Sequence, residues 1–155
     1  HSGNYHPRVL GNAMTQSYLL NARAAVERGD DRAALGASRQ ALEMLTSKVW
    51  GWLGRCEQGM LTLKIAGSGA EPGLRNLCEG IRAKLRGAPN FEHADKAPII
   101  QALDHILGIP EQSLVWLYLN KGTHEEANRE DFDVGVVELV VHTLESLNAL
   151  QLRAR

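Results

Sequence analysis

An apolar stripe through residues 31–52 constrains the fold of this chain more than any other feature. Its members recur at steps of seven, three, four and three residues, which places them on one side of a helix: Leu35, Leu42, Leu45, Val49 and Trp52. Small side chains beside the stripe, at Ala34, Ala37 and Ala41, let another helix approach closely. The chain must therefore bury a long helical face, which favours packing of helix on helix.

Apolar patterns of the same period predict further helices on both sides of this one. They cover about residues 12–28, 72–86 and 96–107, and a segment after Pro110 that ends at the sequence NKGTH. A final helix begins near Asp131 or Asp133, either of which suits its N-cap, and runs to about residue 152. Gly29 suits the end of the first helix, and Asp30 or Asp31 suits the start of the second, so these two helices should be antiparallel neighbours. No βαβ unit, glycine-rich phosphate loop or dinucleotide fingerprint is present. We predict an all-α fold, a bundle of about six helices.

The same spacing groups the apolar side chains of the last two helices. Leu114, Leu117 and Tyr118 share one side of the helix that ends at NKGTH, with Trp116 and Leu119 beside them. In the final helix the predicted inner side begins at one valine and ends at a glutamine: Val134, Val137, Val140 or Val141, Leu144, Leu147 and Gln151.

The organisation along the chain is that of one domain. Its 155 residues fit a single core. Residues 1–12 are expected to be an extended lead-in, or a remnant of expression cloning, and residues 13–155 the helical domain. Near residues 60–70, alternation of apolar and polar side chains predicts a short strand or an irregular arm.

Composition narrows the classes of function. A net charge of -1 argues against broad, charge-driven binding of nucleic acid, and no apolar run approaches the ~18 residues of a membrane span, so no membrane partner is expected. Cys56 and Cys78 form no C-x-x-C motif and are interpreted as reduced thiols of a cytoplasmic protein. The six histidines show no ligand spacing on one helix, so neither a metal nor a cofactor is predicted.

One predicted helix has a basic side. Arg75, Arg82, Lys84 and Arg86 stand there against a single acid, Glu79. These side chains could contact phosphate, as weak nucleic-acid-binding candidates, or they could form an ordinary solvated face.

The segment NKGTH is the strongest candidate for chemistry. His124 can move protons near neutral pH, Lys121 can stabilise negative charge on a phosphate oxygen, and Asn120 can orient a substrate or the imidazole. The alternative is structural: Lys121-Gly122 is also typical of a helix C-terminus. Between residues 125 and 133 five acids accompany one base, and they favour the protonated form of the histidine.

Two segments together resemble the HEPN superfamily. AVERGDDRAALGASRQALEMLTSKVWGWL is similar to its opening helical hairpin, with Arg39 and Glu43 at polar positions of that pattern. LNKGTHEE, followed by a long apolar helix, resembles the place of the family's active-site motif. The version here looks most like HEPN domains attached to SMC/RecF-like ABC ATPases of bacterial anti-phage defence or DNA-repair-like systems. The resemblance covers about residues 15–152.

The resemblance implies a helical bundle that acts as a metal-independent endoribonuclease, usually as a homodimer whose two motifs line one cleft. The family motif is an arginine, four to six residues, then a histidine. His124 matches the histidine and Asn120 the polar position after the arginine. The places for the arginine hold Leu117, Tyr118 and Leu119, so Lys121 is the nearest cation, and lysine lacks the arginine fork. Arg39 and Glu43 are expected to support the site from a facing helix, or to be a plain surface pair.

Two functions follow from this resemblance, and a helical scaffold unrelated to the superfamily is a third interpretation, because amphipathic bundles share such patterns. The first is a HEPN-type ribonuclease that uses His124, Asn120 and Lys121 on RNA. The second is a non-catalytic HEPN-like module that dimerises or docks a partner for a larger ATPase, in the same chain or in another. In that case Trp50, Trp52 and Trp116 are candidate anchors of the interface.

Overall fold

The computed structural model describes residues 6–9, 11–56, 73–89, 91–108, 113–121 and 132–154. Within these ranges the chain forms six helices and two short strands, which confirms the predicted all-α bundle. The helices are α1 (Ala13–Glu27), α2 (Asp31–Cys56), α3 (Leu74–Gly87), α4 (His93–Leu107), α5 (Leu114–Lys121) and α6 (Val134–Ala149). The strand-like arm predicted near residues 60–70 lies outside the described residues.

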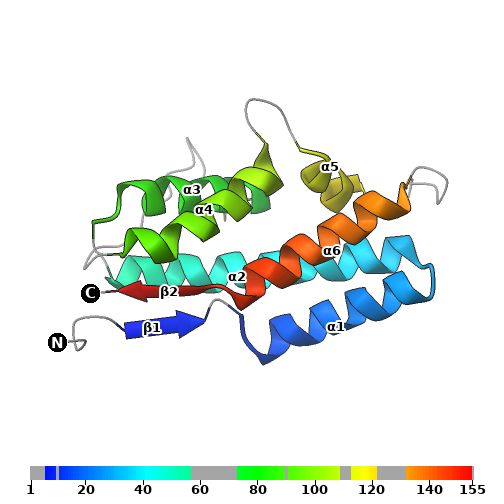
Figure 1. Cartoon of the computed structure of the whole chain (residues 1–155), viewed down its shortest axis with the longest axis horizontal. Coiled ribbons are helices and arrows are strands. Elements are labelled where there is room, and N and C mark those ends of the chain that lie inside the picture. The colour runs from blue at the N-terminus through cyan, green and yellow to red at the C-terminus, as the bar shows by residue number, and fades with distance from the viewer. Residues whose placement is uncertain are drawn as a thin grey trace.

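Helix α2 is the centre of the bundle. It contacts α1, α3, α5 and α6, with α3 and α4 packed together over one half of its length, while α6 crosses it and α1 runs alongside (Figure 1). The predicted stripe explains this position, because Leu35, Leu42 and Leu45 are all buried at 2 % exposure or less. Burial of each such leucine contributes roughly 1.5–3 kcal/mol. The side chains of Val49 and Trp52 lie outside the described set.

The predicted hairpin of α1 and α2 is confirmed, and its ends follow from local chemistry. The side chain of Asn12 accepts a hydrogen bond from the Thr15 amide at 2.9 Å and so caps the start of α1. Gly29 supplies the positive φ of 76° that the turn needs, and Asp30 accepts from the Ala33 amide at 3.2 Å.

The apolar face noted for α5 in the sequence is not the face that the structure buries. Val115, Trp116 and Leu119 are buried, whereas Leu114 and Leu117 are 57 % and 42 % exposed. This helix has only eight residues and is apolar on nearly every side, so periodicity alone does not choose its inner face. Contacts with α2, α4 and α6 decide it.

Two further expectations, one for Trp116 in α5 and one for Val134 in α6, are also wrong. Trp116 is 6 % exposed and packs under the guanidinium of Arg75, which rules it out as an exposed interface anchor. Val134 is 67 % exposed, because it is the first residue of α6, directly after the capping side chain of Asp133. The rest of the predicted inner side of α6 is buried from Val137 to Leu147.

The final helix ends earlier than predicted, and the two ends of the described chain pair with each other. Leu150 is extended, and strand β2 (Gln151–Ala154) runs antiparallel to β1 (His6–Val9), as Figure 1 shows. Leu152 is fully buried while Gln151 is exposed, so Gln151 does not lie on the inner side. The change from helix to strand alters which side chains point inward. The predicted lead-in contributes β1 to this ribbon.

No helix in the described ranges is both long enough and apolar enough to cross a membrane.

Candidate functional site

The candidate site lies at the C-terminal end of α5. Asn120 is exposed there, in the last turn of a helix that the structure describes as far as Lys121. The side chain of Lys121 and the whole of His124 lie outside the described residues. The structure therefore positions the predicted polar residue and the helix that carries it.

Arg39 reaches this end of α5 from α2. Its Nη1 lies 3.4 Å from Oδ1 of Asn120 and 3.5 Å from the carbonyl oxygen of Leu119, and it donates to both. Its Nε donates to Glu43, one turn further along α2, at 3.2 Å. The predicted supporting pair and the predicted polar residue thus come together, although 81 residues separate Arg39 from Asn120.

The position of Arg39 follows from the helix that carries it. Leu35 and Leu42, one turn before and one turn after, are fully buried, so Arg39 stands at the edge of the buried stripe where α2 meets α5. Its side chain is 24 % exposed. A cation beside the last carbonyls of a helix also complements the partial negative charge of that helix end.

Tyr118 and Phe132 bring α5 and α6 together beside the site. Their rings meet edge to face with centroids 5.6 Å apart, and the Tyr118 hydroxyl accepts a hydrogen bond from the Asp133 amide at 2.8 Å. The Asp133 side chain in turn caps α6, as predicted, by accepting from Gly135 and Val136. Tyr118 was predicted only as a packing residue, and no local signal in the sequence indicates its hydroxyl bond to a residue 15 positions away.

The basic side of α3 is largely engaged with neighbouring helices. Arg82 and Arg86 both contact Asp104 of α4 at 2.9 Å, and Arg82 is only 16 % exposed. Arg75 pairs with Glu79, donates to the Leu107 carbonyl at 3.2 Å and stacks over Trp116 at 5.4 Å. A simple solvated face therefore does not describe these three arginines. Two of these guanidinium groups share one carboxylate, and phosphate contact stays a prediction.

Cys78 has the environment of an inert thiol. It is fully buried on α3, and burial raises its pKa from 9.0 to about 12, against the smaller lowering effect of Arg75 and Arg82. Across the described part of the chain, no three side chains of the His, Cys, Asp or Glu types gather as a metal site would require.

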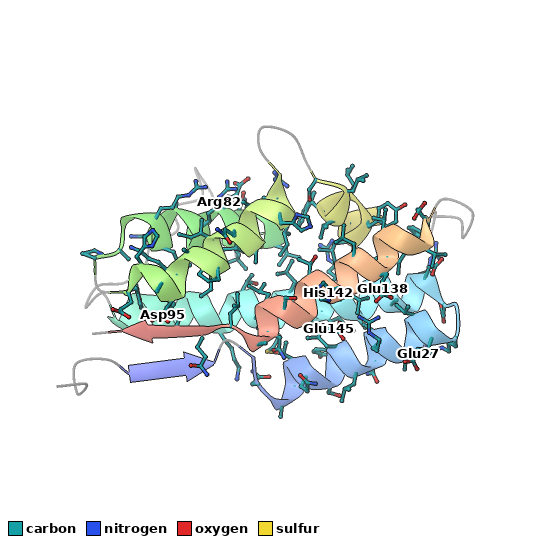
Figure 2. The ribbon with its side chains drawn as sticks, viewed as in Figure 1. Glu27, Arg82, Asp95, Glu138, His142 and Glu145 are labelled. Carbon is teal, nitrogen blue, oxygen red and sulfur yellow. The ribbon has the colours of Figure 1, made fainter. Side chains whose placement is uncertain are left out.

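A second group of charges joins α1 to α6. Arg23 of α1 forms ion pairs with Glu138 and Glu145, which lie on the side of α6 that faces α1, with His142 between them along the helix (Figure 2). Hydrogen bonds to Glu145 and then to Glu138 raise the pKa of Arg23 above its usual value. Nε, Nη1 and Nη2 of Arg23 all donate to carboxylates, so this group acts as a clasp between the two helices.

Comparison with known proteins gives no relative for this chain. No protein-family model matches it, no curated protein matches it, and no solved structure matches it.

Proposed function

We propose that this protein is a HEPN-type domain that cleaves RNA without a metal ion. The observation that supports this proposal is the contact between Arg39 and Asn120, since it joins a cation from α2 to the polar end of α5. A phosphodiester cleavage needs a group that moves protons and a cation near the phosphate. In the proposal His124 moves the protons, and Asn120 and Lys121 orient and stabilise the substrate.

The experiment is a cleavage assay with purified protein, single-stranded RNA and excess chelator. We expect cleavage that leaves a cyclic phosphate on one product and a 5′-hydroxyl on the other, and complete loss of cleavage in His124→Ala. His142→Ala is the matched control, because His142 is an exposed histidine of α6 and should leave the rate unchanged. Intact RNA after incubation with a folded, dimeric sample would contradict the proposal.

A second candidate, a non-catalytic dimerisation or docking module, is favoured by exposed apolar side chains. Leu114 and Leu117 are exposed on α5, and Val134 and Leu139 on the neighbouring α6. Exposed apolar groups of this kind are typical of protein contacts when they are contiguous. Sedimentation at several concentrations tests this function. A dimer that dissociates in Leu117→Lys, together with intact RNA, would favour it, whereas a monomer at high concentration would weaken it.

The same proposal extends to the system in which this domain works. A HEPN-type domain of this kind would serve a cytoplasmic defence or nucleic-acid-processing system together with an SMC/RecF-like ABC ATPase segment, in the same chain or in a partner. Sequencing the complete gene and its neighbours tests this, because an ATPase segment should be encoded there.

A further inference from the structure

Among the residues that the structure describes, Arg39 has hydrogen-bond donors that its contacts do not use. Its Nε is held by Glu43 at 3.2 Å, but its Nη1 contacts to Leu119 and Asn120, at 3.5 and 3.4 Å, lie at the outer limit for hydrogen bonds. Within the described part of the chain, Nη2 makes no hydrogen bond. Arg23, by contrast, directs Nε, Nη1 and Nη2 at two carboxylates.

This geometry suits an anion with two oxygens. The two Nη groups of an arginine form a planar fork that matches a phosphate or carboxylate in bidentate fashion. Glu43 fixes the guanidinium through Nε, on the side edge that Nε shares with Nη2, whereas the fork of Nη1 and Nη2 is the end edge. The side chain is 24 % exposed, so a ligand can reach it, while partial burial weakens the screening of its charge by water.

We propose that Arg39 contacts the scissile phosphate of the RNA, with Glu43 and Asn120 as its positioning residues; this inference rests on the proposed function. The 2′-oxygen attacks phosphorus and forms an O2′–P bond, while the P–O5′ bond breaks. The proton of the 2′-hydroxyl passes to the acid–base group of the proposed function, and that group supplies the proton that the leaving 5′-oxygen takes up. Arg39 transfers no proton. It stabilises the added negative charge on the two non-bridging oxygens.

The sequence of α5 lacks a cation at the places where the family motif has its arginine. Leu117, Tyr118 and Leu119 supply no cation, and Leu119 is fully buried in the core. The cation instead comes from α2, through a contact between residues 81 positions apart. The simplest rival explanation is that Arg39 only caps the end of α5 through the Leu119 carbonyl. A purely structural role of that kind is separable by experiment.

The test is single-turnover cleavage of RNA by the full chain, with variants Arg39→Ala and Arg39→Lys. We expect a rate loss on the order of 100-fold for Arg39→Ala. Millimolar guanidinium should restore part of that rate, and Arg39→Lys should retain more activity than Arg39→Ala. The matched control is Lys48→Ala, which removes an exposed cation from the same helix and should cleave at the wild-type rate. Thermal denaturation of each variant monitors the fold.

The outcomes separate the two proposals. If the wild-type protein does not cleave RNA, the proposed function fails and this inference fails with it. If the wild type cleaves and Arg39→Ala cleaves equally fast, only the inference is overturned. It is overturned as well if neither guanidinium nor lysine restores any rate and the melting temperature falls in parallel with activity, since that pattern is the one expected of a helix cap.

Discussion

Two arginines join helices in this molecule, and their surroundings differ. Arg23 connects α1 to α6 through two carboxylates. Arg39 connects α2 to α5 through a side-chain amide and a backbone carbonyl, and it also pairs with a carboxylate of its own helix. The α1–α6 contact is reinforced again at its other end, where Asn148 donates to Gln16 at 2.9 Å. The first contact therefore directs all three guanidinium nitrogens at carboxylates, while in the second, among the described residues, Nη2 makes no hydrogen bond.

Cys78 shows that nearby arginines do not by themselves give a group a low pKa. Arg75 and Arg82 lower its pKa, yet burial outweighs both and raises the pKa to about 12. Since each pH unit is a factor of ten, the thiolate fraction at pH 8 should be about 1,000-fold lower than for a thiol of ordinary pKa. In a Cys56→Ser background, labelling by a thiol reagent should be very slow in the native protein and fast in denaturant.

The same pKa has a consequence for stability. The unfolded thiol ionises first, so the stability from the buried neutral thiol is complete below pH 9 and is lost as the pH rises toward about 12. Equal labelling rates in the native and denatured protein would contradict the burial of Cys78.

The α5 side of the comparison depends on which face of that helix is buried. Leu119 is fully buried and Leu117 is 42 % exposed. Leu119→Ala should lower the free energy of unfolding by about 2–5 kcal/mol, because it leaves a cavity. Leu117→Ala should change it by less than about 0.5 kcal/mol. Urea denaturation measures both changes. A larger loss for Leu117→Ala than for Leu119→Ala would show that the face with Leu117 is the buried one.

The α1–α6 side can be broken at Gly11. A Cβ atom at this position would lie 1.7 Å from Oδ1 and 2.4 Å from Cγ of Asn148, whose amide also bonds to Gln16. Gly11→Ala should therefore destabilise the protein by about 1–3 kcal/mol through overpacking. The double variant with Asn148→Ala should recover part of this loss in a double-mutant cycle. Strict additivity of the two changes would show that the close approach does not exist.

The smallest expected effect compares the two arginines directly. Arg23→Gln leaves Glu138 and Glu145 without their shared cation and should lower the free energy of unfolding by about 1 kcal/mol, given the partial exposure of these groups. Arg39→Gln should lower it by a few tenths of a kcal/mol, since it removes mainly an i,i+4 pair. High salt should weaken the first effect. Equal losses of unfolding free energy in the two variants would show that Arg23 and Arg39 contribute alike to stability.

The sequence predicted those features that neighbouring residues fix. The α1–α2 hairpin, the stripe of α2 and the cap at Asp133 all follow from spacing and side-chain type within a few residues. Arg39, Glu43 and Asn120 were selected as candidates by the same local reading together with a family resemblance. Their roles remain proposals.

Other features were decided only by tertiary structure. The buried face of α5, the pairing of β1 with β2, and the contact of Arg39 with Asn120 link residues far apart in the chain. The clasp from Arg23 to Glu145 spans 122 positions. Local periodicity makes a segment helical and can propose a buried face, but in a short helix that is apolar on most sides the neighbouring helices choose that face. The same packing decides which polar groups meet at the end of α5, and so whether a cation missing from the local sequence is supplied from elsewhere.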